Sequence, residues 1–153
     1  MIMISSARGK LLGVQEQEFY NHPDWYVIHP VKRSHRHSLA MVFRNAVKNK
    51  NLFYDQNKRT EIYKHGTDAK VPCGCDCSSL ARQAIVESIC SIPNCTTYNI
   101  KDECLKTGLF QVYKFKSKED LWNGDLLVYR TQGKGHIVCV THGGKSNSSK
   151  TSK

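Results

Sequence analysis

The spacing of apolar residues changes once along this chain, close to Gly108. Before that point apolar residues recur at helical intervals, which predicts helices over residues 34–47, 55–64, 77–92 and 99–106. After it they alternate or form short runs between turns, which predicts strands over residues 109–115, 126–129 and 136–141. Helices followed by strands favour an α+β domain with its helices packed on one antiparallel sheet.

The ends of the predicted helices carry local signals. Ser34 is a candidate N-cap for the first helix, Gly66 stands where a left-handed C-cap would close the second, and Pro93 prevents the third from continuing. Residues 1–30 contain no long periodic segment. The aromatic side chains of residues 19–26 around Asn21-His22-Pro23 suggest a loop that covers part of the core.

A chain of 153 residues, 39% of them hydrophobic, can form one ordinary core but not two. We expect one monomeric domain over residues 1–144 and a polar tail over residues 145–153. No apolar run approaches the roughly 18 residues of a membrane span, and the opening segment does not resemble a secretory signal. These features predict synthesis in the cytoplasm without a signal peptide, and no membrane partner.

Lysine and arginine outnumber the carboxylates 23 to 13, which gives a formal net charge of +10. Such an excess favours a polyanionic partner through long-range attraction. Nucleic acid, an anionic membrane and an anionic cell wall all satisfy this condition. The sequence has no helix-turn-helix, zinc-finger or aromatic-sheet signature, so we do not expect nucleic acid as the partner.

The seven cysteines are an odd number, and a complete disulfide framework is not expected without secretion. Cys73 and Cys75 could hold zinc together with a later cysteine, but Cys-x-Cys is not the usual spacing of a zinc knuckle. We therefore expect no metal, and we place these two residues in a loop that leads into the site. Cys139 is expected in the core. The basic segment that holds His29, His35 and His37 is interpreted as a solvated turn before a helix.

Cys77 differs from the other cysteines because it stands at the start of a predicted helix. The free N–H groups and the dipole of a helix N-terminus favour a thiolate. His136 opens a predicted strand after a Gly-rich loop, where it could face that helix end. A cysteine and a histidine that share a proton form a competent nucleophile.

Two sequence blocks around these residues resemble those of the NlpC-type peptidases of bacterial cell walls. Asp-Cys-Ser-Ser-Leu at residues 76–80 is similar to the family's Asp-Cys-Ser-Gly-Leu motif. Residues 124–128 and 135–138 are similar to its Gly-Asp-Leu turn and its histidine strand. Residues 54–59 are similar to a segment of a phage-lysin branch of this papain-like group, which is related to the CHAP amidases and endopeptidases.

The resemblance implies a papain-like fold without a cofactor, with Cys77 as nucleophile and His136 as base. Backbone N–H groups near Cys77 would bind the oxyanion, Asp76 would face a substrate amine or hold the loop, and Ser78 and Tyr54 would line the site. The family hydrolyses the peptide stem of peptidoglycan, often after D-glutamate, and some relatives cut the muramoyl-alanine amide instead. Without a signal peptide this favours a phage or prophage lysin whose basic surface is drawn to anionic wall polymers. A basic module that binds nucleic acid, with or without zinc, is the alternative of another class.

The third polar residue that orients the histidine in this family is not obvious. His142 lies on the same predicted strand as His136, roughly 20 Å away at about 3.3 Å per residue. Asn147 could return beside His136 if the chain turns back at residues 143–144. We favour a Cys–His dyad over Asn147, and both over His142.

Overall fold

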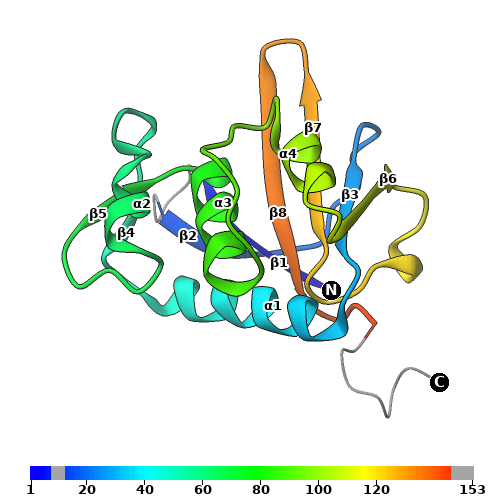
Figure 1. The fold of residues 1–153 in the computed structure, drawn as a ribbon, viewed down its shortest axis with the longest axis horizontal. Helices are drawn as coiled ribbons and strands as arrows, with labels where there is room; N and C mark the ends of the chain where they lie inside the picture. Colours follow the sequence, from blue (N-terminus) through cyan, green and yellow to red (C-terminus); the bar gives the residue numbers. More distant parts are fainter. Residues whose placement is uncertain (8–12, 146–153) are drawn as a thin grey trace.

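The computed structural model describes residues 1–7 and 13–145 of an α+β domain (Figure 1). Its helical segments are α1 (Arg33–Lys48), η1 (Gln56–Lys58), α2 (Glu61–His65), α3 (Cys77–Ser88), α4 (Ile100–Lys106) and η2 (Lys118–Asp120). Its strands are β1 (Ile2–Ala7), β2 (Gly13–Glu18), β3 (Tyr26–Pro30), β4 (Leu52–Tyr54), β5 (Cys73–Cys75), β6 (Phe110–Lys114), β7 (Leu126–Thr131) and β8 (Lys134–His142).

The strands form one curled sheet in the order β5-β4-β2-β1-β8-β7-β3-β6. All neighbouring strands are antiparallel except β4 and β5, which are parallel. α1 and α3 pack against each other and against β1 and β8, near the middle of the sheet. The predicted α+β class is therefore confirmed, with a sheet larger than the three strands that the sequence indicated.

Apolar side chains are buried on both faces of the central strands. Ile137 and Cys139 of β8 join the core under α1 and α3, whereas Val138 and Val140 join a second cluster around Trp25. This two-sided burial explains why β8 has a continuous apolar run in place of alternation.

Most of the predicted helices and strands after residue 33 are confirmed, but β4 and β5 were not predicted and the helix expected up to residue 92 ends at Ser88. α1 begins at Arg33 after Lys32, and no side chain caps it, so the prediction of Ser34 as N-cap is wrong. The single helix predicted over residues 55–64 is divided into η1 and α2, and Gly66 closes α2 with a positive φ of 79°, although its ψ of 172° is not that of a left-handed cap.

The expectation that the helices precede all the strands is wrong, because residues 1–30 contain β1, β2 and β3. β1 lies between β2 and β8, so its side chains are buried on both faces of the sheet. Ser5 and Ser6 are buried there among apolar neighbours, which hides the strand from a search for apolar periodicity. Only the turn between β2 and β3 matches the expected aromatic loop, and its Trp25 is fully buried.

The prediction that Cys73 and Cys75 lie in a loop is also wrong. They form the ends of β5 and are fully buried, because free cysteine behaves as a small apolar side chain. Gly74 between them packs so closely on Lys58 that an added Cβ would lie 2.7 Å from its carbonyl oxygen. Across residues 1–7 and 13–145, no three His, Cys, Asp or Glu side chains are placed to hold a metal ion together.

The turn at residues 124–125 is held by packing and hydrogen bonds. Gly124 has a φ of 99°, and an added Cβ would collide with the backbone of Arg36. The fully buried Asp125 accepts hydrogen bonds from the Trp122 N–H, at 2.9 Å, and from Nδ1 of His29, at 2.7 Å. Part of the segment interpreted as a solvated basic turn is therefore inside the protein, since Arg36 is also buried.

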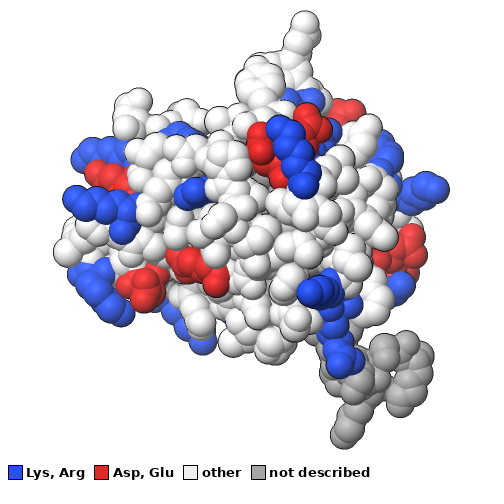
Figure 2. All heavy atoms as spheres, in the orientation of Figure 1, with Lys and Arg blue, Asp and Glu red and all other residues white. Residues whose placement is uncertain are grey.

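The charged side chains do not gather in one basic patch on the face shown in Figure 2, where acidic groups lie among the lysines and arginines. Lys145, which we assigned to the polar tail, exchanges backbone hydrogen bonds with Leu121 and Asn123. Among the described residues no helix has both the length and the apolar character needed to cross a membrane.

Candidate active site

The N-terminus of α3 is fixed by a reciprocal pair of hydrogen bonds. Oδ1 of Asp76 accepts from the Ser79 N–H at 2.8 Å, and the Ser79 hydroxyl accepts from the Asp76 N–H at 2.9 Å. Ser79, at the third helical position, completes this capping box with its hydroxyl, which the glycine of the NlpC motif could not do. It holds Cys77 as the first residue of α3.

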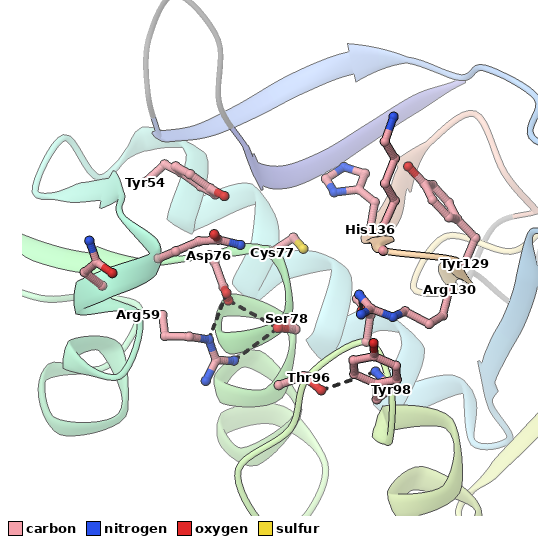
Figure 3. Close-up of a pocket in the computed structure, with 16 residues that line it drawn as sticks. Tyr54, Arg59, Asp76, Cys77, Ser78, Thr96, Tyr98, Tyr129, Arg130 and His136 are labelled. Atoms are coloured by element: carbon pink, nitrogen blue, oxygen red, sulfur yellow. Dashed lines mark hydrogen bonds and ion pairs between the residues drawn. The ribbon is translucent and has the colours of Figure 1, made fainter.

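Cys77 and His136 line one pocket of about 800 Å³ (Figure 3). α3 contributes Cys77 and β8 contributes His136, and the Cys77 sulfur points toward the side of the pocket that holds the histidine. The Cys77 sulfur also faces the backbone N–H of Ile137, the next residue along β8. The structure thus brings together the two residues that the sequence selected as a dyad.

Burial favours the neutral form of both groups. Burial, reinforced by the Asp76 carboxylate, raises the pKa of the Cys77 thiol to about 11, although the N–H groups of Ile137 and Ser78 act against this. Burial lowers the pKa of His136 from its ordinary value of 6.5. The N–H group of Ser78 at the helix end acts in the expected direction, but desolvation outweighs it, so the net shift disfavours the thiolate.

Asp76 and Ser78 belong to an ion-paired cluster next to Cys77. Arg59 donates from Nε to Oδ2 of Asp76 at 2.8 Å and from Nη2 to the Ser78 hydroxyl at 3.1 Å. A further bond, at 2.7 Å, joins Nη2 to the carbonyl oxygen of Cys95. Asp76 therefore holds the loop, which was one of its two expected roles.

The remaining pocket wall comes from segments whose contribution the sequence did not reveal. Tyr54 of β4 lines the pocket as expected. Opposite it lie Tyr98, from the segment before α4, and Tyr129 and Arg130 of β7. Nothing in the sequence spacing links these residues, because the sheet order and the turn before α4 bring them to the pocket.

Of the three residues considered for orienting His136, the structure places one, Ser5, beside it. The hydroxyl oxygen of Ser5 lies 3.4 Å from Nε2 of His136, a contact that sequence reasoning missed. His142 lies at the opposite end of β8, where its exposed side chain contacts the Thr141 hydroxyl at 2.9 Å. Asn147 lies outside the described residues.

Comparison with known proteins gives one family. The model of the endolysin-like domain matches residues 9–147, which include every residue that lines the pocket. Searches of curated proteins and of solved structures found no match. Because the matched segment covers most of the chain, the protein belongs to the endolysin-like domain family, which suggests a lysin that acts on peptidoglycan.

Proposed function

We propose that this protein is a cysteine peptidase of the papain-like NlpC type that hydrolyses an amide bond in the peptide stem of peptidoglycan. The observation that carries the proposal is the pocket shared by Cys77, at the N-terminus of α3, and His136, on the facing strand β8. Membership of the endolysin-like domain family supports the choice of substrate.

The chemistry starts from a neutral thiol and a neutral imidazole. As the Cys77 sulfur attacks the scissile carbonyl carbon, its proton passes to His136 and the carbonyl oxygen becomes an oxyanion. Backbone N–H groups beside Cys77 stabilise that oxyanion. The C–N bond then breaks as His136 returns the proton to the leaving amine, which gives an acyl-enzyme thioester. Water, deprotonated by His136, hydrolyses the thioester and restores the thiol.

We assign the bond between D-glutamate and the diamino acid as the one cleaved. Digestion of purified peptidoglycan followed by mass spectrometry tests this assignment. A new free amino terminus on the diamino acid is expected. Release of intact stem peptides from muramic acid would instead identify an N-acetylmuramoyl-L-alanine amidase that uses the same dyad.

The catalytic role of the thiol is tested by comparing two cysteine variants. Cys77→Ala is expected to lower wall hydrolysis by more than about a thousandfold, as loss of a nucleophile does. Cys90→Ala is the matched control, because Cys90 is also half-buried but does not line the pocket. Thermal melting of both variants establishes that they are folded. Hydrolysis by a folded Cys77→Ala protein at the native rate would disprove the cysteine mechanism.

We further propose that the residues up to 145 belong to one catalytic domain and that the protein acts on the wall after release from the host cytoplasm. The net charge of +10 would draw it to anionic wall polymers. Binding to purified wall fragments at low and high ionic strength tests this attraction, which screening should weaken.

A further inference from the structure

The pocket is lined by more positively charged than negatively charged side chains. Asp76 is the single carboxylate among the described residues that line it, and both of its oxygens are already occupied. Oδ2 accepts from Arg59, and Oδ1 accepts from the Ser79 N–H and from the Ser78 hydroxyl. Asp76 is only 6% exposed, so it cannot pair with a substrate amine without giving up these bonds.

The cations of the opposite wall have no such partner. Arg130 and Lys134 line the pocket from the β7–β8 hairpin, and neither forms an ion pair with a described residue. With Asp76 neutralised by Arg59, the pocket carries a net positive charge. That balance favours an anionic group on the bound ligand.

Arg130 is held in a fixed orientation. Its guanidinium lies 3.5 Å from the centroid of the Tyr98 ring, and Nη1 donates to the Thr97 hydroxyl at 3.2 Å. Its Nε is buried without a hydrogen-bond partner among the described residues. Gly135, opposite Arg130 in the β7–β8 ladder, leaves the space that the guanidinium and Thr97 occupy, because an added Cβ would collide with both.

A planar guanidinium held by stacking and by one hydrogen bond is well suited to binding a carboxylate. Figure 3 shows Arg130 reaching from β7 into the pocket on the side of His136, with Tyr98 beneath it. We infer that Arg130, supported by Tyr98 and Thr97, is a carboxylate-binding subsite that selects stem peptides with a free carboxylate near the scissile bond. This inference rests on the proposed function for the identity of the ligand.

The chemistry of the stem supplies such a group. D-glutamate is linked through its side-chain carboxyl, so its α-carboxyl stays free beside the scissile amide or is converted to an amide in some cell walls. The two forms have nearly the same shape and differ in charge. The subsite would therefore distinguish cell walls by whether the α-carboxyl of D-glutamate is amidated, and it would prefer the free carboxylate.

Binding to the inactive full-length Cys77→Ala protein tests the inference separately from catalysis. The probes are two capped synthetic stem peptides that differ only in the α-carboxylate or α-amide of D-glutamate, titrated by calorimetry. The carboxylate peptide is expected to bind about tenfold more tightly, the effect of one hydrogen bond to a charged group. Arg130→Gln in the same background is expected to remove that preference, and Arg130→Lys to retain only part of it.

Lys118→Gln is the charge-matched control, because Lys118 is exposed and lies outside the pocket. It should leave the preference unchanged. Equal affinity for the two peptides, no measurable binding of either, or a preference that survives Arg130→Gln would overturn the inference. A failure of the native protein to hydrolyse peptidoglycan, with the binding preference intact, would count against the proposed function and not against the subsite.

Discussion

The hydroxyl oxygen of Ser5 lies 3.4 Å from Nε2 of His136, although the two residues are 131 positions apart in the sequence. The contact crosses from β1 to its sheet neighbour β8. If Ser5 accepts a hydrogen bond from Nε2, Nδ1 carries the lone pair that can take the Cys77 proton. Ser5 is then the residue that positions His136, which could not be identified from the sequence.

Replacement of Ser5 tests this role. Ser5→Ala is expected to lower kcat by about two- to tenfold, the effect of a net hydrogen bond of about 0.5–1.5 kcal/mol, with KM little changed. Ser5→Thr keeps the hydroxyl and should restore most of the rate. The acid limb of the pH–rate profile should move in Ser5→Ala and return in Ser5→Thr, which a purely structural defect would not produce. An unchanged pH–rate profile and an unchanged kcat in Ser5→Ala would show that Ser5 does not orient His136.

The pH dependence of activity follows from the two buried groups. Burial lowers the pKa of His136, and only the neutral ring can act as base, so kcat/KM should fall as the pH drops through a midpoint below 6.5. Burial raises the pKa of Cys77 to about 11, so its alkylation by iodoacetamide should keep accelerating above pH 8. An alkylation rate that levels off near neutral pH would show that the resting site holds a thiolate.

Arg59 should contribute measurably to stability. Arg59→Leu leaves the carboxylate of Asp76 without its cation in a mostly buried position, and we expect a loss of about 1–3 kcal/mol in the free energy of unfolding. Lys106→Leu is the control, because its pair with Glu103 is largely exposed and should cost less than about 1 kcal/mol. Urea unfolding measures both, and adding Asp76→Asn to Arg59→Leu should recover part of the loss if the unpaired charge is its cause.

Gly124 should tolerate substitution poorly for a reason unrelated to catalysis. Gly124→Ala would combine a φ of 99° with a collision against the backbone of Arg36, and we expect it to cost more than about 2 kcal/mol. Gly108→Ala is the matched control, since Gly108 has a φ of 74° but open space around its Cβ position. It should cost about 1–2 kcal/mol. Similar melting temperatures for the two variants would mean that the Arg36 backbone can move away from the added methyl group at little cost in stability.

The elements that could be predicted from the sequence are those with a clear period or a local end signal. α1 and α3 have apolar faces at helical spacing, and β7 and β8 follow recognisable turns. β1 and β5 had neither: β1 buries two serines, and β5 is a three-residue strand whose apolar members are Cys73 and Cys75. Their burial is decided by neighbouring strands distant in sequence, which a local window cannot contain.

In the candidate site, too, features with a local sequence signal could be predicted and features that depend on distant residues could not. Cys77 and His136 could be selected because each stands in a local motif at the start of an element. The residues that contact them could not be identified from the sequence. Ser5 contacts His136 because β1 and β8 are neighbours in the sheet, and Arg59 contacts Asp76 through an ion pair. The pKa of Cys77 was misjudged for the same reason, since the helix end is local but the desolvation comes from the surrounding fold.

The central place of β1 between β2 and β8 has a consequence for the order of folding. A nascent chain holds its first strand long before the last one has been synthesised. His136 cannot acquire the environment set by Ser5 until β8 leaves the ribosome and pairs across almost the full length of the chain. Contacts of such long range form slowly. Cys77 and His136 can therefore share one pocket only after β8 has been synthesised, and a nascent chain that stops before β8 carries the Cys77 thiol without the histidine.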